Sequence, residues 1–388
     1  MKPIVHRARQ RIGAAARAAV FILKALPATS GAIDRVTLAP VIEKFSYPSL
    51  GGHSEADLFR PSSPGPHPAV VVSLGVVPAG VDHPHRARFG EALARAGFVA
   101  LLHWSPAMRD LRLDPTDIDD LVSAYSALLE RADVDPARAG FIGTCVGGSL
   151  ALLAAARPQI RDRLAFVSAY APYASMWTFA CDVGSASRSI DGPREPWRVD
   201  PLVWTTYVRS VTAWLDPCER TRLRDDFQDR FTWDAAKTLV VESPVVHPVP
   251  SDLSADGMAV HRILTATGAS SVALALRDLP GSVQAAFDAM SPISVVDQIR
   301  SPLIVLLHDR HDHIVPVSES RRLWSVLRGR EGTSYTELEF RHLDPRKLSP
   351  RQLASELPKL FRAVYPIYRQ TAASPRRARG ETVAERAG

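Results

Sequence analysis

Short apolar runs alternate with longer amphipathic stretches over much of this sequence. Residues 303–307 are apolar throughout, which is typical of a strand covered by helices on both faces. Further strand candidates are residues 36–47, 56–60, 69–75, 98–102 and 138–142, and helix candidates are residues 86–96, 115–131 and 350–368. This alternation predicts an α/β fold with a mostly parallel central sheet and helices on both faces.

A long insert, residues 173–291, separates two parts of this pattern. It holds five of the seven tryptophans, at positions 177, 197, 204, 214 and 233. Asp200-Pro201 is a good helix start, and Val203, Tyr207 and Val211 follow at helical spacing. We expect a helical cap over the active site of a core formed by residues 34–172 and 292–370. Its aromatic side chains then form the cap's own core or line an apolar pocket.

The N-terminal segment, residues 1–33, has the pattern of a basic amphipathic helix. Apolar residues at helical spacing form one face, and polar residues repeat every seven on another. The apolar set is Ile12, Ala16, Ala19, Leu23 and Leu26, and the polar set is Gln10, Arg17 and Lys24. Because charges interrupt a short run, a membrane span is not predicted. We expect the helix to pack against the protein body, with peripheral contact to an anionic membrane as the alternative.

Composition is that of an ordinary enzyme of the cytoplasm. The 388 residues are 46% hydrophobic and 23% charged, enough for a large core. The three cysteines form no C-x-x-C pair, which favours a reducing compartment. The net charge of +6 is modest and concentrated at the ends, so no nucleic-acid partner is predicted. Residues 371–388 are rich in arginine and small residues and are predicted to be disordered.

The six residues Gly143-Thr-Cys-Val-Gly-Gly148 read as a nucleophile elbow with cysteine in place of serine. A strand that turns sharply into a helix holds its turn residue at strained angles, so Gly143 and Gly147 are needed to avoid clashes. Cys145 then projects at the positive end of a helix. That position predicts a lowered thiol pKa and a reactive thiolate. The alternative is a small buried hydrophobe in a glycine-rich turn.

The partners of a catalytic triad follow downstream in the order acid, then histidine. Asp312 lies after the apolar strand 303–307 and three residues before Val315, and it is the favoured acid, with Asp309 in reserve. His342 comes thirty residues after Asp312, at the end of an alternating strand pattern over 336–340, and is the candidate base.

His308, His311 and His313 crowd the same stretch and raise the alternative of a metal site, to which His83 and His85 could contribute. Closely spaced histidines on an irregular loop do not converge as metal ligands do. The sequence therefore predicts neither a metal nor another cofactor.

Backbone amides must also stabilise the oxyanion. The strand 69–75 ends at a glycine, and the next residue, Val76, is the most plausible donor there. The second donor is Val146, directly after the nucleophile.

These motifs resemble the α/β-hydrolase superfamily, and the Gly-x-Cys-x-Gly-Gly elbow looks most like the dienelactone-hydrolase branch. Val134-Asp-Pro-Ala-Arg138 and the segment 312–316 are also similar. The resemblance covers roughly 34–172 and 292–370. It implies Cys145 as nucleophile, Asp312 as acid and His342 as base. Dienelactone hydrolases carry a glutamate near the end of the strand before the oxyanion loop. The corresponding stretch of this sequence, residues 73–77, contains no glutamate.

Together these features predict a Cys-His-Asp acyl hydrolase acting on a small ester, thioester or lactone through an acyl-cysteine. An acyltransferase with the same intermediate is the nearest alternative. An alternative outside the enzymes is a non-catalytic binding protein on a hydrolase fold. If this alternative holds, Cys145 has the reactivity of an ordinary thiol and His342 is not placed to act as its base.

Overall fold

The computed structural model describes residues 2–76, 84–228, 230–233, 239–242, 252–339 and 349–372. Its centre is an eight-stranded sheet in the order β1-β2-β4-β3-β5-β6-β11-β12. The strands are β1 (Val41–Ser49), β2 (Gly52–Arg60), β3 (His67–Ser73), β4 (Val99–His103), β5 (Val134–Thr144), β6 (Phe166–Tyr170), β11 (Ile304–Asp309) and β12 (Thr333–Leu338). Strand β2 runs antiparallel to both neighbours, and all other pairs are parallel. The predicted α/β class with a mostly parallel sheet is confirmed.

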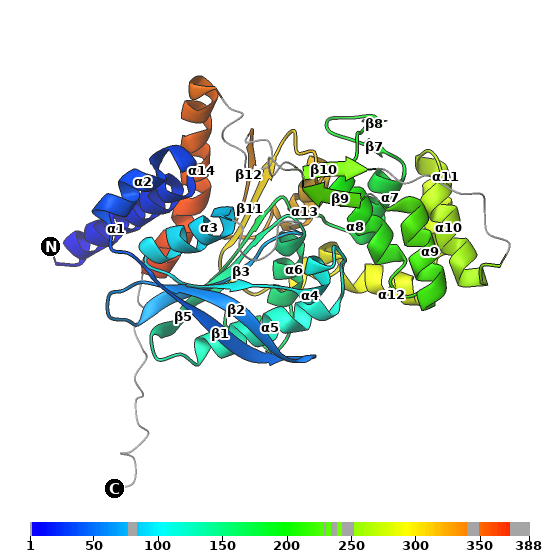
Figure 1. The fold of residues 1–388 in the computed structure, drawn as a ribbon. Coiled ribbons are helices and arrows are strands. Elements are labelled where there is room, and N and C mark those ends of the chain that lie inside the picture. The colour runs from blue at the N-terminus through cyan, green and yellow to red at the C-terminus, as the bar shows by residue number, and fades with distance from the viewer. Residues whose placement is uncertain are drawn as a thin grey trace, which may run out of the picture.

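Helices cover both faces of the sheet (Figure 1). One face packs against α1 (Lys2–Ala25), α3 (Pro84–Arg95) and α14 (Pro350–Ala372). The other packs against α5 (Thr116–Leu129), α6 (Val146–Ala155) and α13 (Val317–Leu327). The short helix α4 (Pro106–Arg109) follows β4, and the 3-10 turns η1 (Pro292–Ser294) and η2 (Val296–Gln298) precede β11. Side chains alternate between the two faces, so Val71 and Val72 belong to different apolar clusters.

The predicted first strand, 36–47, begins too early. Residues Pro27–Val36 form helix α2, and β1 starts only at Val41. Pro27 favours the first turn of a helix because its fixed φ suits that position. Asp34 on α2 then pairs with Lys24 at 2.6 Å and with Arg95 at 2.9 Å. These long-range ion pairs and the burial of Ile33 hold the segment as a helix.

Helix α1 packs on the protein body, but through the opposite face from the predicted one. Ile12 is 70% exposed, whereas Arg17 and Lys24 face α3. Arg17 donates to the carbonyls of Ala96 at 2.6 Å and Gly97 at 3.0 Å, which follow the end of α3. Lys24 also binds Glu91 at 2.8 Å. The buried apolar residues of α1 are Ala14, Ala18 and Ile22. Arg17 and Lys24 therefore join α1 to the core, whereas Arg9 and Arg11 are exposed.

The insert lies at one end of the sheet and is mainly helical (Figure 1). Its helices are α7 (Met176–Gly184), α8 (Pro201–Val211), α9 (Pro217–Phe227), α10 (Ala255–Thr265), α11 (Ala269–Arg277) and α12 (Gly281–Ala289). Asp200 caps α8, as its sequence predicts, by accepting a hydrogen bond from the Leu202 amide. Two short hairpins were not predicted, β7 (Ser187–Arg188) with β8 (Glu195–Pro196) and β9 (Arg230–Trp233) with β10 (Leu239–Glu242). Buried side chains of the insert continue the apolar cluster of α5 and α6.

None of the helices in the described part of the chain is long and apolar enough to cross a membrane. The three cysteines are free: Cys145 is buried, Cys181 half-buried and Cys218 exposed. Most of the predicted disordered tail, from residue 373 onward, lies outside the described residues.

Candidate active site

Cys145 occupies the turn between β5 and α6 with left-handed backbone angles, φ 55° and ψ −131°. Such angles are costly for a residue with a side chain, and they cluster at functional sites. Main-chain hydrogen bonds hold the turn in place. The Cys145 amide donates to the Tyr170 carbonyl at 2.7 Å, and the Gly148 amide donates to the Cys145 carbonyl at 2.9 Å. The strand-turn-helix geometry predicted from sequence is present.

Two glycines of this turn have no room for a side chain. A Cβ on Gly143 would lie 2.3 Å from the Gly147 carbonyl oxygen. A Cβ on Gly147 would lie 2.1 Å from the Ser73 carbonyl oxygen at the end of β3. Both distances are too short for any real contact, so the turn requires glycine at these positions.

Gly75 brings the loop after β3 against the cysteine. A Cβ on Gly75 would lie 2.8 Å from the Cys145 Cβ and 3.4 Å from its Sγ. Val76 follows directly and lines the same small cavity as Cys145 and Val146. The two residues predicted to supply oxyanion amides thus both border the thiol. The rest of the predicted loop, 77–80, lies outside the described residues.

The predicted lowering of the Cys145 pKa is wrong. Burial raises the pKa of the thiol to about 12, and the negative charge of Asp312 adds to the rise. The Val146 amide interacts with the sulfur and acts in the opposite direction. Cys145 is only 8% exposed, so the cost of desolvating a thiolate exceeds the stabilisation that the positive end of α6 gives it. The resting group is therefore a neutral thiol that needs a base.

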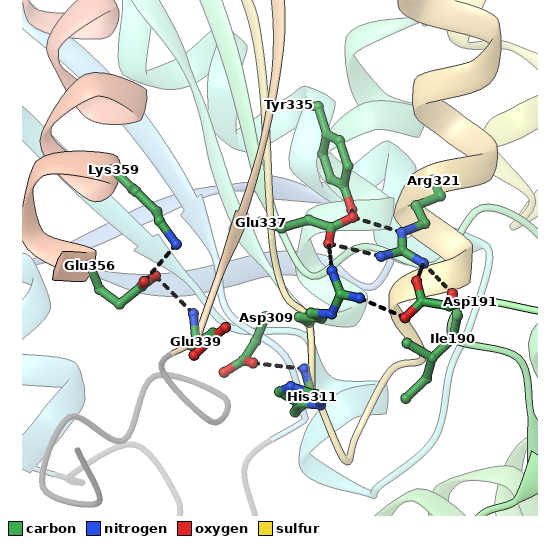
Figure 2. Close-up of polar contacts among 11 residues, drawn as sticks. Ile190, Asp191, Asp309, His311, Arg321, Tyr335, Glu337, Glu339, Glu356 and Lys359 are labelled. Carbon is green, nitrogen blue, oxygen red and sulfur yellow. Dashed lines mark hydrogen bonds and ion pairs between the residues drawn. The ribbon is translucent and has the colours of Figure 1, made fainter. Parts of the chain in front are cut away.

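Both candidate acids are fully buried at the carboxyl end of β11. Asp312 accepts hydrogen bonds from the amides of Ile314 at 2.7 Å and Val315 at 3.1 Å. Asp309 is the last residue of β11 and accepts from the His311 amide at 3.0 Å (Figure 2). Of the two, Asp312 is the one whose charge acts on the Cys145 thiol.

The candidate base, His342, lies outside the described residues. The strand that leads to it, β12, ends at Leu338 beside Asp309 of β11. The next amide, that of Glu339, donates to Glu356 of α14 at 3.0 Å, and Lys359 binds the same carboxylate at 2.6 Å (Figure 2). Glu356 is 2% exposed, so this buried carboxylate fixes the point where the chain leaves the sheet.

The neighbouring histidines do not converge on a common point. His308 is buried, with Nδ1 2.6 Å from the Ser320 hydroxyl and Nε2 2.9 Å from the Val315 carbonyl oxygen. His311 and His313 are exposed. No group of three or more histidine, cysteine or acidic side chains suited to a metal ion occurs among the described residues. His83 and His85 are not among the side chains described.

An apolar cavity of about 40 Å³ lies over Cys145, between the core and the insert. The core contributes Val76, Leu113 and Ile314, and helices α7 and α8 contribute Phe179, Val183 and Val203 among others. Ile314 belongs to the loop that carries Asp312. The cavity therefore brings together the thiol, the acid loop and the two insert helices closest to them. Sequence reasoning missed Leu113 and Phe179, because no motif marks a cavity wall.

The hairpin of β7 and β8 is fastened to the acid loop and to α13. Arg188 donates to the Asp312 carbonyl at 2.6 Å. Between the two strands, Asp191 pairs with Arg310 at 2.6 Å and with Arg321 of α13 at 3.0 Å (Figure 2). Arg321 also forms a two-point pair with Glu337 of β12, at 2.7 and 2.8 Å. This charged network joins the insert, the acid loop and the sheet.

A buried glutamate fixes the start of the insert's first helix. Glu319 of α13 accepts hydrogen bonds from the amides of Ala174 at 2.8 Å and Ser175 at 3.2 Å, and from the Thr178 hydroxyl at 2.8 Å. Its side chain also pairs with Arg322. Helix α7, which forms one wall of the cavity, is thus anchored directly to the core.

This strand order and these helix layers are those of the α/β-hydrolase fold, and comparison with solved structures agrees. An acylaminoacyl peptidase bound to Z-Gly-Gly-Phe-chloromethyl ketone matches with a TM-score of 0.50 and 13% identity over 84% of this chain and 41% of that one. The Pyrococcus horikoshii acylaminoacyl peptidase matches with a TM-score of 0.50 and 14% identity, over 83% of this chain and 41% of that one. This chain thus spans less than half the length of these peptidases. No protein-family model and no curated protein matches it.

Proposed function

We propose that this protein is an acyl hydrolase that cleaves a small ester, thioester or lactone through an acyl-cysteine at Cys145. The observation that carries the proposal is the strained turn, with a positive φ at Cys145, that places this residue in the wall of an apolar cavity. Strain of this kind is retained where the turn residue has a task. Val76 and Val146, the two residues proposed to supply backbone amides for an oxyanion, border the same sulfur.

Catalysis begins with removal of the thiol proton. Because burial raises the pKa of Cys145 to about 12, the thiol does not ionise by itself near neutral pH. His342, oriented by Asp312, takes this proton as the sulfur attacks the carbonyl carbon. The choice of Asp312 over Asp309 is supported by its electrostatic effect on Cys145 and by Ile314, which joins its loop to the cavity.

The negative charge that develops on the carbonyl oxygen is stabilised by the amides of Val76 and Val146. The carbon–oxygen or carbon–sulfur bond to the leaving group then breaks, and His342 returns its proton to that group. Water, deprotonated by His342, attacks the acyl-cysteine and releases the carboxylic acid and the thiol. A thiolate leaves more readily than an amine, so ester cleavage is favoured over peptide cleavage.

The insert acts in this proposal as a cap. Helices α7 and α8 line the cavity over Cys145. Glu319 anchors the start of α7 to the core, and Arg188 ties the hairpin of β7 and β8 to the acid loop. Apolar side chains of the two helices shield the sulfur from bulk water, and this strengthens the interactions of the amides with the oxyanion. The dienelactone-hydrolase resemblance of the elbow agrees with this cysteine chemistry.

The experiment measures hydrolysis of p-nitrophenyl acyl esters by the native protein and by matched variants. Cys145→Ala and His342→Ala should each lower kcat/KM by about 10³-fold or more, and Cys218→Ala, at an exposed cysteine, should have no effect. Asp312→Asn should lower the rate by about 10²-fold or more, whereas Asp309→Asn should change it only a few-fold. Full activity in Cys145→Ala would refute the proposal.

Product analysis in the presence of an added alcohol or thiol separates hydrolysis from acyl transfer. Free acid as the main product supports the hydrolase. Transfer of the acyl group to the acceptor as the main reaction would replace it with the acyltransferase. Absence of both turnover and acylation, with a folded protein, would support a binding function.

A further inference from the structure

Helix α1 packs with its predicted apolar stripe turned away from the protein. The stripe consists of Ile12, Ala16, Ala19 and Leu23, which fall on one side of the helix at helical spacing. Ile12, Ala16 and Leu23 are exposed. Single exposed apolar side chains are common on proteins, but a surface helix normally turns such a stripe to the core. The orientation of α1 therefore requires an explanation other than folding.

Further apolar side chains are exposed near the C-terminal end of α1. Val36, the last residue of α2, is 77% exposed, and Leu38 is 74% exposed. Asp34 of α2 joins this segment to α1 and α3, because it pairs with both Lys24 and Arg95. Arg95 in turn donates to the Leu38 carbonyl at 3.2 Å. The backbone after α2 is thus held next to the end of α1, with large apolar side chains in solvent.

The charged residues of this part of the chain are almost all basic. Residues 1–38 contain seven lysines and arginines and one acidic residue, Asp34. That carboxylate is already paired with Lys24 of α1 at 2.6 Å. Arg9 and Arg11, in contrast, are exposed in the turn of α1 that precedes the stripe. The surface that α1 offers to a partner is therefore both apolar and positively charged.

This combination limits the chemistry of the partner. A second copy of the chain on the same surface would bring two basic clusters together, which repulsion between like charges disfavours. A bilayer with anionic lipids offers phosphate groups to the arginines and an apolar layer just below them. A helix that binds in this way lies in the plane of the membrane surface. None of the helices in the described residues could span the bilayer instead.

We propose that α1, together with the segment after α2, docks this protein on the surface of an anionic membrane. Ile12, Leu23 and Leu38 enter the boundary between the headgroups and the acyl chains, and Arg9 and Arg11 bind lipid phosphates. Helices α1 and α2 lie side by side at the end of the molecule opposite the insert (Figure 1). Substitutions on this surface therefore leave the candidate active site untouched, and the inference does not depend on its chemistry.

Cosedimentation of the native full-length protein with lipid vesicles measures this docking. Vesicles of phosphatidylcholine with about 30% phosphatidylglycerol should bind it with a partition coefficient about tenfold or more above that of pure phosphatidylcholine vesicles. An increase from about 0.1 M to about 0.5 M NaCl should lower the binding several-fold, because salt screens the attraction between arginine and phosphate.

Substitutions in the stripe test its apolar contribution. Ile12→Gln and Leu23→Gln should each lower the partition coefficient by about fivefold or more, because an apolar side chain no longer enters the bilayer. Leu38→Gln should have an effect of the same size. Leu274→Gln, at an exposed leucine of α11 in the insert, is the matched control and should have no effect.

Substitution of the exposed arginines tests the charge. The double variant Arg9→Gln with Arg11→Gln should lower binding to the anionic vesicles by about tenfold or more and weaken its dependence on salt. The matched control removes two exposed arginines of the insert, Arg262→Gln with Arg277→Gln, and should bind like the native protein. All these positions are exposed, so the melting temperatures should stay close to that of the native protein.

Three results would overturn the proposal: no binding to anionic vesicles, equal binding to neutral and anionic vesicles, or native-like binding by Ile12→Gln. A dimer in sedimentation-velocity ultracentrifugation that Ile12→Gln converts to a monomer would assign the stripe to a second copy of the chain and also overturn it. Hydrolysis of esters should be the same in Ile12→Gln and in the native protein. The membrane proposal and the proposed function can therefore fail separately.

Discussion

Arg188 of the insert donates a hydrogen bond to the main-chain carbonyl of Asp312, with Nη1 2.6 Å from the oxygen. The two residues are far apart in the sequence, and one belongs to the hairpin of β7 and β8 while the other is the candidate acid. The bond ties the loop that carries the acid to the insert. It is reinforced by Asp191, which binds Arg310 of the same loop.

Arg188→Met should therefore lower kcat/KM by about tenfold, equivalent to about 1.4 kcal/mol, with most of the loss in kcat. The cause is a less well fixed acid loop, since Arg188 does not line the cavity. Steady-state kinetics of the purified variant measure the effect, and Arg188→Lys should recover part of it. Arg300→Met, which removes an exposed pair with Asp162, serves as control. Equal kinetics for the native protein and Arg188→Met would show that this contact does not position the acid.

Gly75 should tolerate no side chain. In Gly75→Ala the new Cβ would lie 2.8 Å from the Cys145 Cβ, so the loop or the turn must move. We expect a loss of about 1–3 kcal/mol in the free energy of unfolding and a fall in activity of about tenfold or more. Urea denaturation and ester hydrolysis measure the two effects. Gly31→Ala, where nothing lies within 4 Å, should not destabilise the protein, and an equal result for both variants would contradict the packing argument.

Alkylation of Cys145 should be slow at neutral pH. Because the pKa of the buried thiol is raised to about 12, its thiolate fraction and hence its reaction rate with iodoacetamide should increase about tenfold per pH unit between about pH 7 and pH 9. Peptide mass mapping of the labelled protein gives the rate at each cysteine. Cys218, which is exposed, is the internal reference. A plateau for Cys145 below about pH 9 would mean that the thiol is activated at rest.

Asp117 should make stability depend on pH. This residue of α5 is 2% exposed, its carboxyl accepts from Ser105 at 2.6 Å, and burial raises its pKa from 3.8 to about 7. Above about pH 4 the unfolded chain releases this proton while the folded protein keeps it, so this contribution to stability is complete below about pH 4 and is lost as the pH rises to about 7. Asp117→Asn does not titrate. Its free energy of unfolding relative to that of the native protein should rise by on the order of 4 kcal/mol from about pH 4 to about pH 8.

Denaturation curves at a series of pH values test this directly. Asp119→Asn, at a half-buried position on the same helix where the carboxylate pairs with Arg157 at 3.4 Å, is the control and should follow the native pH dependence. The account of Asp117 fails if Asp117→Asn also runs parallel to the native protein over the whole range.

Features that depend on neighbouring residues were predicted well from the sequence. The turn at Cys145 requires glycines within a few positions, so the six residues 143–148 define it locally. The apolar strand 303–307 likewise led to β11 and to the two acids at its end. The alternation of helices and strands predicted the α/β class, and the resemblance of the elbow and its neighbouring motifs implied the α/β-hydrolase fold.

Features that depend on distant partners were not predictable in this way. The buried face of α1 includes Arg17 and Lys24 because Ala96, Gly97 and Glu91 are placed to receive them. No periodicity within α1 shows those partners. The pKa shift of Cys145 was predicted in the wrong direction for a related reason. The sequence shows that Cys145 lies at the start of α6, which lowers the thiol pKa, but it does not show how deeply the packed insert buries the thiol, which raises the pKa more.

Helix α8 illustrates the same limit in the insert. Helical spacing placed Tyr207 with Val203 and Val211 on one apolar face, which is correct. That Val203 and Tyr207 line a cavity over Cys145 follows only from how α8 packs on the core.

The central claim is that Cys145 carries the acyl group during turnover, and intact-protein mass spectrometry during reaction with p-nitrophenyl butanoate tests it most directly. We predict an early increase equal to one acyl group in the native protein and in Cys218→Ala, located on Cys145 by peptide mapping and lost as the substrate is consumed. Cys145→Ala should show none. Turnover by Cys145→Ala, or an adduct on another residue of the native protein, would contradict the account.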